Sequence, residues 1–449
     1  MIEDLPIMES RAPLSADEIT RLFDSTEVDE EWTFAECSRS DTNKWTHGYH
    51  RYPAKFIPQI VEKLFDLYIT TETAHVNDPF YGSGTTIASA ISRGYRATGT
   101  DINGIAHLIT KAKATPIEPD YLGKKVKDFL QRTREIISGK TYPSQEIDTV
   151  IPERHAERID YWFPAEHREE LGKILSIIIQ EVDQNVRTFL LVGFSHILKT
   201  CSIWLQRSTK PTRDMNKTPT KPYVALRRHL RRMIRGNREF YQVVPKTVRS
   251  NLEDYLDIRR GDAADQHVED ESVDLIVTSS PYVTSYEYAD LHQLSTIWLD
   301  LAADLRTYRE DFIGSAYRSE EASHFRSEIG RSVVRRVREN DDRTADEIAV
   351  FFSDMERVFA ECFRILRPGG RCCFVIGNTT LKGVDILNAQ VFAESIQYSG
   401  FQLDRVVKRQ IPSKILPQTR DKETGRFTSA SDATSIAYPV EFIVVGRKP

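Results

Sequence analysis

The chain has 449 residues, of which 40% are hydrophobic and 28% charged, and this composition excludes a disordered or fibrous protein. Its formal net charge of -5 excludes a uniformly basic nucleic-acid binder, so any contact with a polyanion has to come from local clustering. The sequence has no run of about 18 apolar residues and starts with an acidic segment, so we expect a cytosolic protein with no membrane contact.

Metal and disulfide frameworks are not expected. The five cysteines form no CxxC pair, and Cys372 and Cys373 are adjacent in an apolar run, where strand geometry points them to opposite faces. The eleven histidines include no HExxH motif. We therefore predict no metal site.

The first elements predict the opening of a βαβ unit. Residues 1–45 are acidic and irregular, with a helix start at 14–18, and are expected to form an N-terminal arm. A short strand begins at Val76, a glycine turn follows at 81–84, and a helix of small residues follows at 85–92. A second strand is predicted at 95–101.

The middle of the chain predicts a helical insertion. Apolar residues recur at helical spacing in 167–182 and 186–204, and a proline-containing loop at 208–223 separates these from an arginine-rich helix at 224–240. Strand patterns return in the last two fifths of the chain, at 273–278, 371–376, 401–411 and 440–445.

The spacing of two acidic residues supports this division. Asp101 and Asp262 lie 161 positions apart, whereas one βα step needs roughly 30 residues. The sequence therefore predicts one α/β domain, residues 46–114 and 255–449, interrupted by a helical and basic insertion at 115–254. A stretch of mixed charge at 307–347 is expected to be a surface loop or small helical excursion near the site.

Positive charge is concentrated in the insertion. Residues 207–249 contain thirteen Lys and Arg against two acidic residues, a local net charge of +11. A solvated helix face usually carries both positive and negative side chains, whereas this segment is almost entirely positive. We therefore predict a phosphate-contacting surface. The residues expected to contact the phosphates of a nucleic acid are Arg227, Arg228, Arg231, Arg232 and Arg235.

The segment 78–86, DPFYGSGTT, follows a strand and opens a helix. Its glycines stand where the backbone turns tightly and approaches a ligand, and Asp101 ends the next strand, where a carboxylate can accept ribose hydroxyl groups. A third glycine is missing at position 87, which favours a nucleoside without phosphates, such as S-adenosylmethionine, over a dinucleotide.

Two motifs carry a resemblance to a known family. DPFYGSGTT resembles the first motif of amino-group DNA methyltransferases, DPFxGSGTT, and TSSPY at 278–282 resembles their catalytic TSPPY. Residues 47–58 resemble the HxYPAKFIP lead-in of cytosine-N4 methylases, which closes over the methionine end of the cofactor. The resemblance implies a doubly wound, Rossmann-like α/β sheet whose final strand, at 440–445, is antiparallel, and it implies S-adenosylmethionine as cofactor. The residues that it assigns to the cofactor are Lys55, Phe56, Asp78, Phe80, Gly82, Ser83, Gly84, Thr85, Asp101 and Asp262.

The catalytic motif suits methylation of an exocyclic amine. The lone pair of an aromatic amine is delocalised into the ring, so two hydrogen-bond acceptors are needed to draw the nitrogen toward tetrahedral geometry. By resemblance, Ser279 supplies a side-chain contact, the Ser280 carbonyl is the second acceptor, Pro281 shapes the turn and Tyr282 stacks on a flipped base. Ser280 replaces the first proline of the family motif, which loosens this turn.

The residue types also discriminate between target atoms. C5 methylation needs a cysteine nucleophile, usually after a proline, and no cysteine here follows proline. Ser279 in place of Asp or Asn resembles cytosine-N4 enzymes more than adenine-N6 enzymes. The expected activity is transfer to cytosine N4 in duplex DNA, in a prokaryotic cytosol.

Three alternatives stay open on the sequence: an adenine-N6 DNA methyltransferase, a guanine-N2 tRNA methyltransferase, and a non-catalytic DNA-binding protein that retains the cofactor. The recognition sequence, the oligomeric state and the existence of a cognate restriction endonuclease also stay open.

Overall fold

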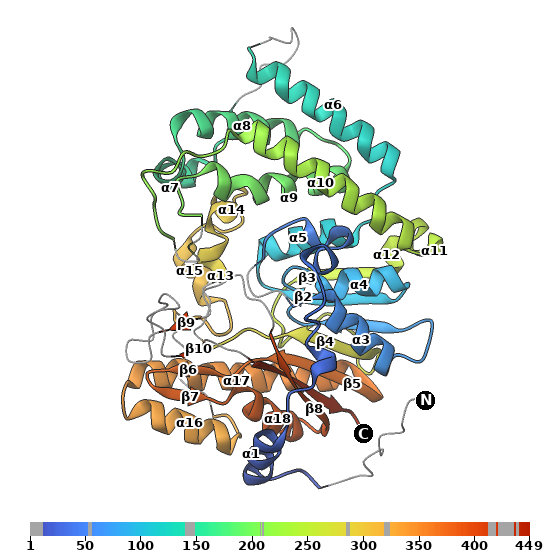
Figure 1. Cartoon of the computed structure of the whole chain (residues 1–449), viewed down its shortest axis with the longest axis vertical. Coiled ribbons are helices and arrows are strands. Elements are labelled where there is room, and N and C mark those ends of the chain that lie inside the picture. Colours follow the sequence, from blue (N-terminus) through green and yellow to red (C-terminus); the bar gives the residue numbers. More distant parts are fainter. Residues whose placement is uncertain are drawn as a thin grey trace.

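A seven-stranded sheet forms the centre of the protein, seen in the computed structural model (Figure 1) in the order β3-β2-β1-β4-β5-β11-β8. The structure describes residues 12–52, 56–139, 149–206, 208, 211–283, 288–317, 324–411, 419–420, 435–436 and 440–449. The strands are β1 (His75–Asp78), β2 (Arg96–Asp101), β3 (Leu256–Arg260), β4 (Val273–Ser279), β5 (Leu366–Ile376), β8 (Gln402–Gln410) and β11 (Val440–Arg447).

The topology is Rossmann-like, as predicted. The strands β3, β2, β1, β4 and β5 are parallel, whereas β11 pairs antiparallel with both β5 and β8. The prediction that the last strand is antiparallel is thus confirmed. Chain order reverses between β1 and β4, which pair side by side, and ligands of such sheets bind outside the carboxyl ends of the strands at this reversal.

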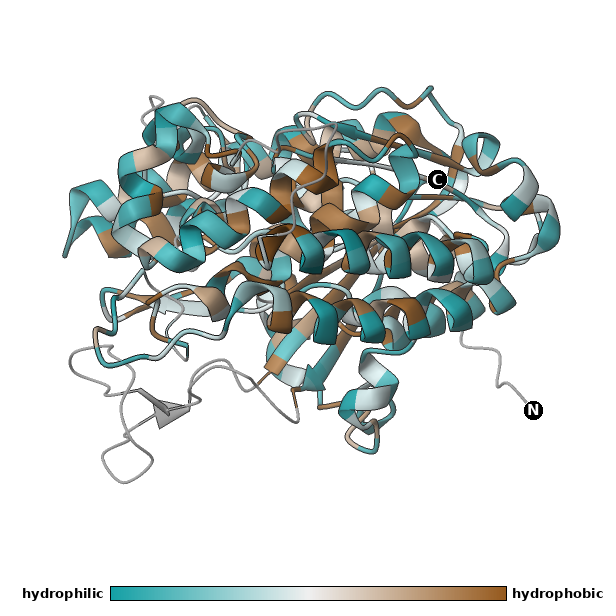
Figure 2. Ribbon diagram, turned by 90° about the horizontal axis from the view of Figure 1, so that it is seen from above, coloured by the Kyte–Doolittle hydropathy of each residue, from teal (hydrophilic) through white to brown (hydrophobic). Residues whose placement is uncertain are grey.

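Alternation along the strands divides the core into two layers. Leu275 and Val277 belong to a cluster with α3 (Pro58–Tyr68) and α4 (Thr85–Arg93), while Ile276 belongs to a cluster with α17 (Asp342–Ile365) and α18 (Asn388–Tyr398). Cys372 and Cys373 fall into different clusters, as the strand geometry predicts. Figure 2 shows the apolar residues gathered between the layers, with the outer helix faces polar.

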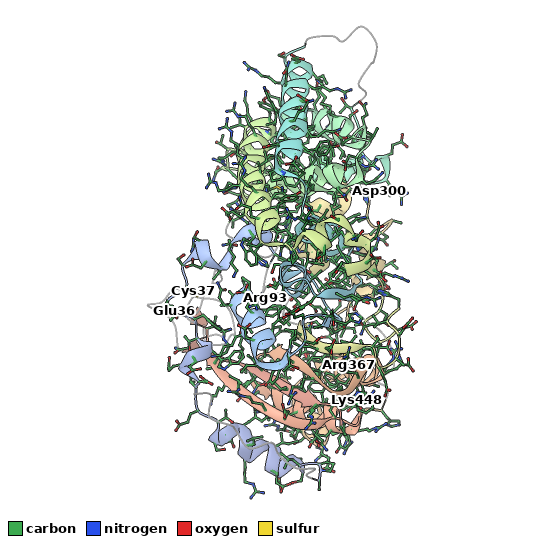
Figure 3. The ribbon with its side chains drawn as sticks, turned by 90° about the vertical axis from the view of Figure 1, so that its right-hand side faces the viewer. Glu36, Cys37, Arg93, Asp300, Arg367 and Lys448 are labelled. Atoms are coloured by element: carbon green, nitrogen blue, oxygen red, sulfur yellow. The ribbon has the colours of Figure 1, made fainter. Side chains whose placement is uncertain are left out.

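Helices of the insertion pack into a third core above the sheet (Figures 1 and 3). Trp162 and Trp204 stack at its centre with ring centroids 5.0 Å apart. Trp298, which follows β4 in the chain, is buried in the same core, so the insertion contacts the segment after the catalytic motif. The helices are α6 (Pro119–Ile137), α7 (Ala156–Trp162), α8 (Ala165–Ile179), α9 (Gln184–Cys201), α10 (Pro222–Val243) and, after β4, α14 (Gln293–Trp298).

The long helix α10 is held at two places, at Ile117 near the start of the insertion and at Trp45, which precedes the glycine turn. The Asn237 side chain donates to the Ile117 carbonyl (2.6 Å) and accepts from the Ile117 N–H (3.0 Å). A Cβ on Gly236 would lie 2.1 Å from the Trp45 carbonyl oxygen, so only glycine allows this approach of the two backbones.

The N-terminal segment also packs on the sheet domain. Helix α1 (Ala16–Ser25) starts with a capping box of Ser15 and Glu18 and buries Ile19 and Phe23 against the cluster of α18. Within the described ranges, no helix is long and apolar enough to cross a membrane.

The stretch of mixed charge at 307–347 contains the end of α15 (Leu305–Glu310), α16 (Glu328–Arg338) and the start of α17, so helices occupy most of its described part. Residues 366–370, LRPGG, form the start of β5 directly after α17 ends at Ile365, and Gly369 in this segment has φ +80°.

Two glycine substitutions test the anchoring of α10. We expect Gly236→Ala to destabilise the protein by about 1–3 kcal/mol, because the new methyl group collides with backbone. Gly123→Ala in α6 meets nothing within 4 Å and should stabilise the protein by about 1 kcal/mol through helix propensity. Chemical denaturation measures both changes, and equal effects would contradict the close approach at Trp45.

Candidate active site

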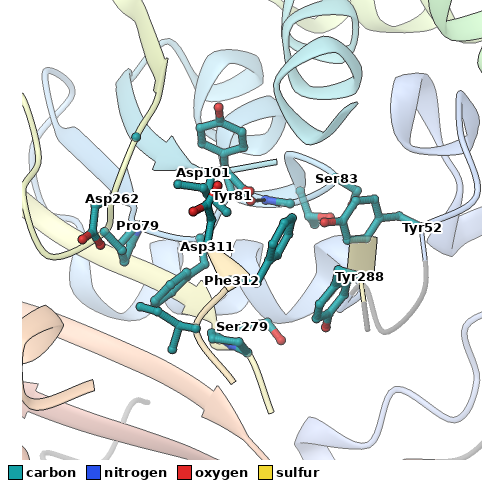
Figure 4. Close-up of a pocket in the computed structure, with 18 of the residues that line it drawn as sticks. Tyr52, Pro79, Tyr81, Ser83, Asp101, Asp262, Ser279, Tyr288, Asp311 and Phe312 are labelled. Atoms are coloured by element: carbon teal, nitrogen blue, oxygen red, sulfur yellow. Dashed lines mark hydrogen bonds between the residues drawn. The ribbon is translucent and has the colours of Figure 1, made fainter. Parts of the chain in front are cut away.

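A pocket opens at the carboxyl edge of the sheet, beside the ends of β1, β2, β3 and β4 (Figure 4). Successive parallel strands end at this edge, so segments far apart in the chain meet here. The predicted site residues that line the pocket are Phe56, Phe80, Gly82, Ser83, Thr85, Asp101, Asp262, Ser279 and Pro281. Other residues lining it are Tyr52, Pro79, Tyr81, Ile102, Gly261, Ala263, Tyr288, Asp311, Phe312 and Ile313.

The glycine turn is held from below by α5 (Gly104–Ala114). Gly82 has φ +47° and Gly84 has φ +69°, both in the left-handed region. The Thr110 hydroxyl donates to the Gly82 carbonyl at 3.0 Å, and the buried Lys113 amine donates to the Ser83 carbonyl. A Cβ on Gly84 would lie 2.6 Å from the Thr110 side chain, so conformation and space both favour glycine here.

Asp101 joins the end of β2 to this turn. One carboxylate oxygen accepts from the Gly82 N–H and the other from the Asn103 N–H, each at 2.8 Å. Burial raises the pKa of the Asp101 carboxyl to about 6 against these two hydrogen bonds. Each oxygen accepts one backbone hydrogen bond, which leaves acceptor capacity for hydroxyl groups in the pocket.

Asp78 has a different position. Its side chain is buried, it does not line the pocket, and its Oδ1 accepts from the Phe80 N–H at 3.1 Å. Burial raises the pKa of Asp78 to about 7. Asp78 therefore supports the turn through its hydrogen bond with the Phe80 N–H, from the buried side of the turn.

Asp262 follows β3 and lies at the more exposed side of the pocket. Its Oδ1 accepts from the Ala264 N–H at 2.9 Å, and Arg357 lies 3.9 Å from Oδ2. The neighbouring Gly261 N–H donates to the Asp101 carbonyl at 3.2 Å, which ties the ends of β2 and β3 together.

The four residues predicted to be catalytic, 279–282, have different surroundings. Ser279 and Pro281 line the pocket. Ser280 is buried, and its hydroxyl finds no hydrogen-bond partner within the described part of the chain. Tyr282 does not line the pocket, and its ring packs beside Gly377 at the end of β5, where a Cβ would lie 3.2 Å from Tyr282 Cε1.

The charged residues that line the described part of the pocket are all acidic. Asp101, Asp262 and Asp311 contribute carboxylates, and none of the described lining residues is Lys or Arg. Such a wall disfavours a phosphate and suits hydroxyl groups and a cationic ligand. The remaining surface is largely apolar and aromatic, which suits a planar ring.

Sequence comparisons find one matching family model and several similar proteins. A model described as DNA methylase matches residues 10–111. Type II methyltransferase M.MvaI of Kocuria varians is 26% identical over 397 residues, covering 84% of this chain and 87% of that protein. Residues 10–111 thus match the DNA methylase family, and over most of its length the chain is similar to a Type II methyltransferase. Two further relatives are Type II methyltransferases M.MjaII of Methanocaldococcus jannaschii, 29% identical over 35% of this chain and 28% of that protein, and M.BsoBI of Geobacillus stearothermophilus, 20% identical over 83% and 82%.

This DNA methylase uses S-adenosylmethionine as its methyl donor, as the two motifs predict. The family match begins at residue 10, inside the segment expected to be an arm. That segment packs on the C-terminal part of the sheet, where the Arg409 side chain donates to the Trp32 carbonyl at 2.6 Å.

Some lining residues of the methylase were not predicted. Tyr52 and Tyr288 face each other across the pocket wall with ring centroids 6.1 Å apart and planes 27° apart. Tyr52 lies within the HGYHRYPAKFIP segment, whose aromatic residues could have indicated it. Lys55 of the same segment lies outside the described residues.

Phe312 reaches the pocket from the turn that follows α15, in the charged stretch expected only to lie near the site. It packs against Tyr308 with ring centroids 5.1 Å apart. The Tyr308 hydroxyl donates to Asn103 Oδ1 and accepts from the Gly104 N–H, each at 3.0 Å. These contacts hold the segment 305–313 against the turn after Asp101, and no sequence pattern indicates them.

The five predicted arginines of α10 are exposed and none lines the pocket. Arg227 lies over the Tyr223 ring, and an Arg232 Nη2 atom lies 3.1 Å from His229 Nδ1.

The raised pKa of Asp78 predicts a pH-dependent contribution to stability. Its folded-state pKa of about 7 lies above the unfolded value of about 3.9, so this carboxyl destabilises the methylase increasingly as pH rises from about 4 to about 7. Asp78→Asn removes the titration. The difference in melting temperature, variant minus native, should therefore increase over this range and level off above it. A pH-independent difference would contradict the assignment.

Proposed function

We propose that this methylase transfers a methyl group from S-adenosylmethionine to the N4 amino group of cytosine in duplex DNA. One observation carries the proposal: the ends of β1, β2 and β4 bring the glycine turn, Asp101 and Ser279 to a single pocket. A donor site and an acceptor-amine site are then within reach of each other.

The pocket suits the cofactor chemically. The carboxylate of Asp101 would accept hydrogen bonds from the ribose hydroxyl groups, and that of Asp262 would accept a hydrogen bond from the amino group of adenine. Phe56, Phe80 and the glycine turn from Gly82 to Thr85 would surround the rest of the molecule. The absence of Lys and Arg from the described lining residues fits a cofactor that carries a sulfonium cation and no phosphate.

S-adenosylmethionine supplies an electrophilic methyl group, which leaves sulfur as the bond to nitrogen forms. The protein has to make the amine nucleophilic. The Ser279 hydroxyl and the Ser280 carbonyl would accept the two amino hydrogens and draw the nitrogen lone pair out of the ring. No covalent enzyme intermediate is required, and one amine proton leaves after transfer.

The flipped base needs an aromatic neighbour. Tyr282 follows Pro281 directly, and its ring lies at the end of β5 on the same edge of the sheet. We assign it to stacking on the base, beside the pocket that it does not itself line. Ser279, in place of an acidic or amide residue, supports cytosine over adenine by resemblance to cytosine-N4 enzymes.

The insertion, residues 115–254, is proposed as the target-recognition domain. Its exposed arginines on α10 would contact DNA phosphates, because positive charge in this part of the chain has few acidic neighbours. The Type II designation of the relatives supports a restriction endonuclease that cuts the same sequence as a partner.

Methyl transfer to mixed-sequence duplex DNA, followed by nucleoside mass spectrometry, tests the proposal. We expect N4-methylcytosine. N6-methyladenine would overturn the base assignment and keep the mechanism, whereas transfer to tRNA alone would overturn the DNA substrate. Cofactor binding without transfer to either nucleic acid would favour a non-catalytic DNA-binding protein.

Two substitutions separate the donor site from the amine site. Ser279→Ala should lower kcat by about 100-fold with unchanged cofactor affinity, because a contact to the reacting amine is lost. Asp101→Asn should weaken cofactor binding by about tenfold or more, since a charged hydrogen-bond acceptor is lost. Calorimetry and steady-state kinetics measure both. Equal loss of cofactor affinity in the two variants would contradict the assignment.

A further inference from the structure

Three buried histidines and the partly buried His196 form a column from α10 to the wall of the pocket. His229 on α10 stacks on His196 of α9, with ring centroids 3.7 Å apart and planes 5° apart. His196 packs edge-on against His50 at 5.5 Å, and His50 lies 6.1 Å from His292. His292 then lies 4.8 Å from Tyr52, which lines the pocket.

Hydrogen bonds fix this column. His229 Nε2 lies 2.8 Å from the Tyr49 carbonyl, and His50 Nε2 lies 2.9 Å from the Ser195 hydroxyl. Burial lowers the pKa of His50 to about 4 and that of His292 to about 3. The imidazoles are therefore neutral at physiological pH and act as a rigid spacer between the elements that they connect.

Three cationic side chains lie beside residues of the column. Arg51 follows His50 directly, and Arg232 approaches His229 with 3.1 Å between Nη2 and Nδ1. Lys199 lies three residues after His196 on α9, so the two share a helix face. Arg51 and Arg232 are exposed and Lys199 is half-buried. The column thus brings charges from the lead-in segment, α9 and α10 to one place.

These cations have no carboxylate partner in the described ranges. Burial, followed by the charges of Arg228 and Arg51, lowers the pKa of Arg232. Burial, followed by the charges of Lys217 and Arg51, lowers the pKa of Lys199 to about 8. Mutual repulsion of this kind is relieved by an anion.

Other arginines of the chain illustrate the difference. Arg364 contacts Glu361 and Asp270, and Arg409 contacts Glu441. Lys199 donates one hydrogen bond, to the Ser208 carbonyl at 2.7 Å, which leaves two further donors on its amine. These donors and the guanidinium groups of Arg51 and Arg232 are available to the oxygens of an anion.

We propose that Arg51, Lys199 and Arg232 form a phosphate site for the DNA backbone beside the target nucleotide. This inference rests on the proposed function and adds to it a named phosphate contact. We expect the bound phosphate to be the one nearest the target nucleotide, because Arg51 directly precedes Tyr52, which lines the pocket. Gripping this phosphate would hold the extruded nucleotide in place.

The salt dependence of DNA binding tests the site. The slope of log K against log salt concentration should decrease in magnitude by about 1 for Arg51→Gln, and by about 2 for the double variant with Arg232→Gln. The control is Arg93→Gln (Figure 3), because Arg93 ends α4 at the opposite edge of the sheet and pairs with Asp66 at 3.0 Å. Arg51→Lys should keep the native slope.

Replacing single DNA phosphates with uncharged methylphosphonates shows which phosphate the proposed site contacts. Once the methylated sequence is mapped, fluorescence anisotropy compares a normal duplex with duplexes that carry one methylphosphonate 5′ or 3′ to the target base. The native protein should lose about tenfold in affinity at one of these positions, and the double variant should lose nothing further there. Equal losses for native protein and variant at both positions, or an unchanged salt slope, would overturn the proposal.

Two controls distinguish a failure of the proposed phosphate site from a failure of the proposed function. Native cofactor affinity and melting temperature in each variant show that the fold and donor site are intact. Methylation of adenine instead of cytosine leaves the phosphate test unaffected. DNA that the native protein fails to bind would overturn both proposals together, whereas native binding with an unchanged slope in the variants overturns the phosphate site alone.

Discussion

The hydrogen bond between the Asp101 carboxylate and the Gly82 N–H is the contact on which the site depends. It links the end of β2 to the turn after β1, and these strands run parallel, so both ends lie at one edge of the sheet. The strand β4 pairs on the other side of β1 and delivers Ser279 to the same edge. Residues separated by about two hundred positions in the chain thus surround one pocket because parallel strands have a common direction.

A second constraint connects the insertion to this edge. Helix α10 packs its buried stripe on the segment from Trp45 to Tyr52, through the bare backbone of Gly236 and the imidazole of His229. The same helix exposes its arginines on the other side. Helix α10 therefore contacts the segment that leads into the pocket wall on one side and exposes its arginines to solvent on the other.

Much of the fold could be predicted because its signals are local. Strand alternation, the glycine turn and the spacing between Asp101 and Asp262 indicated the sheet and its interruption, and chain order with the family resemblance indicated the antiparallel last strand. Contacts at long sequence separation could not be predicted. Phe312 enters the pocket only because Tyr308 bonds Asn103 and Gly104, 204 to 205 positions earlier. A sequence motif also does not show which way each side chain points. The Tyr282 ring packs beside Gly377, and the Asp78 side chain is buried in the interior.

The central claim is that one pocket holds the methyl donor and receives the target amine. A crystal structure with S-adenosylhomocysteine and a duplex containing the mapped sequence tests it most directly. The account predicts ribose hydroxyl groups within hydrogen-bond distance of Asp101, and a flipped cytosine whose N4 lies between the Ser279 hydroxyl and the Ser280 carbonyl. A cofactor bound away from the glycine turn, or a target base left stacked in the duplex, would contradict it.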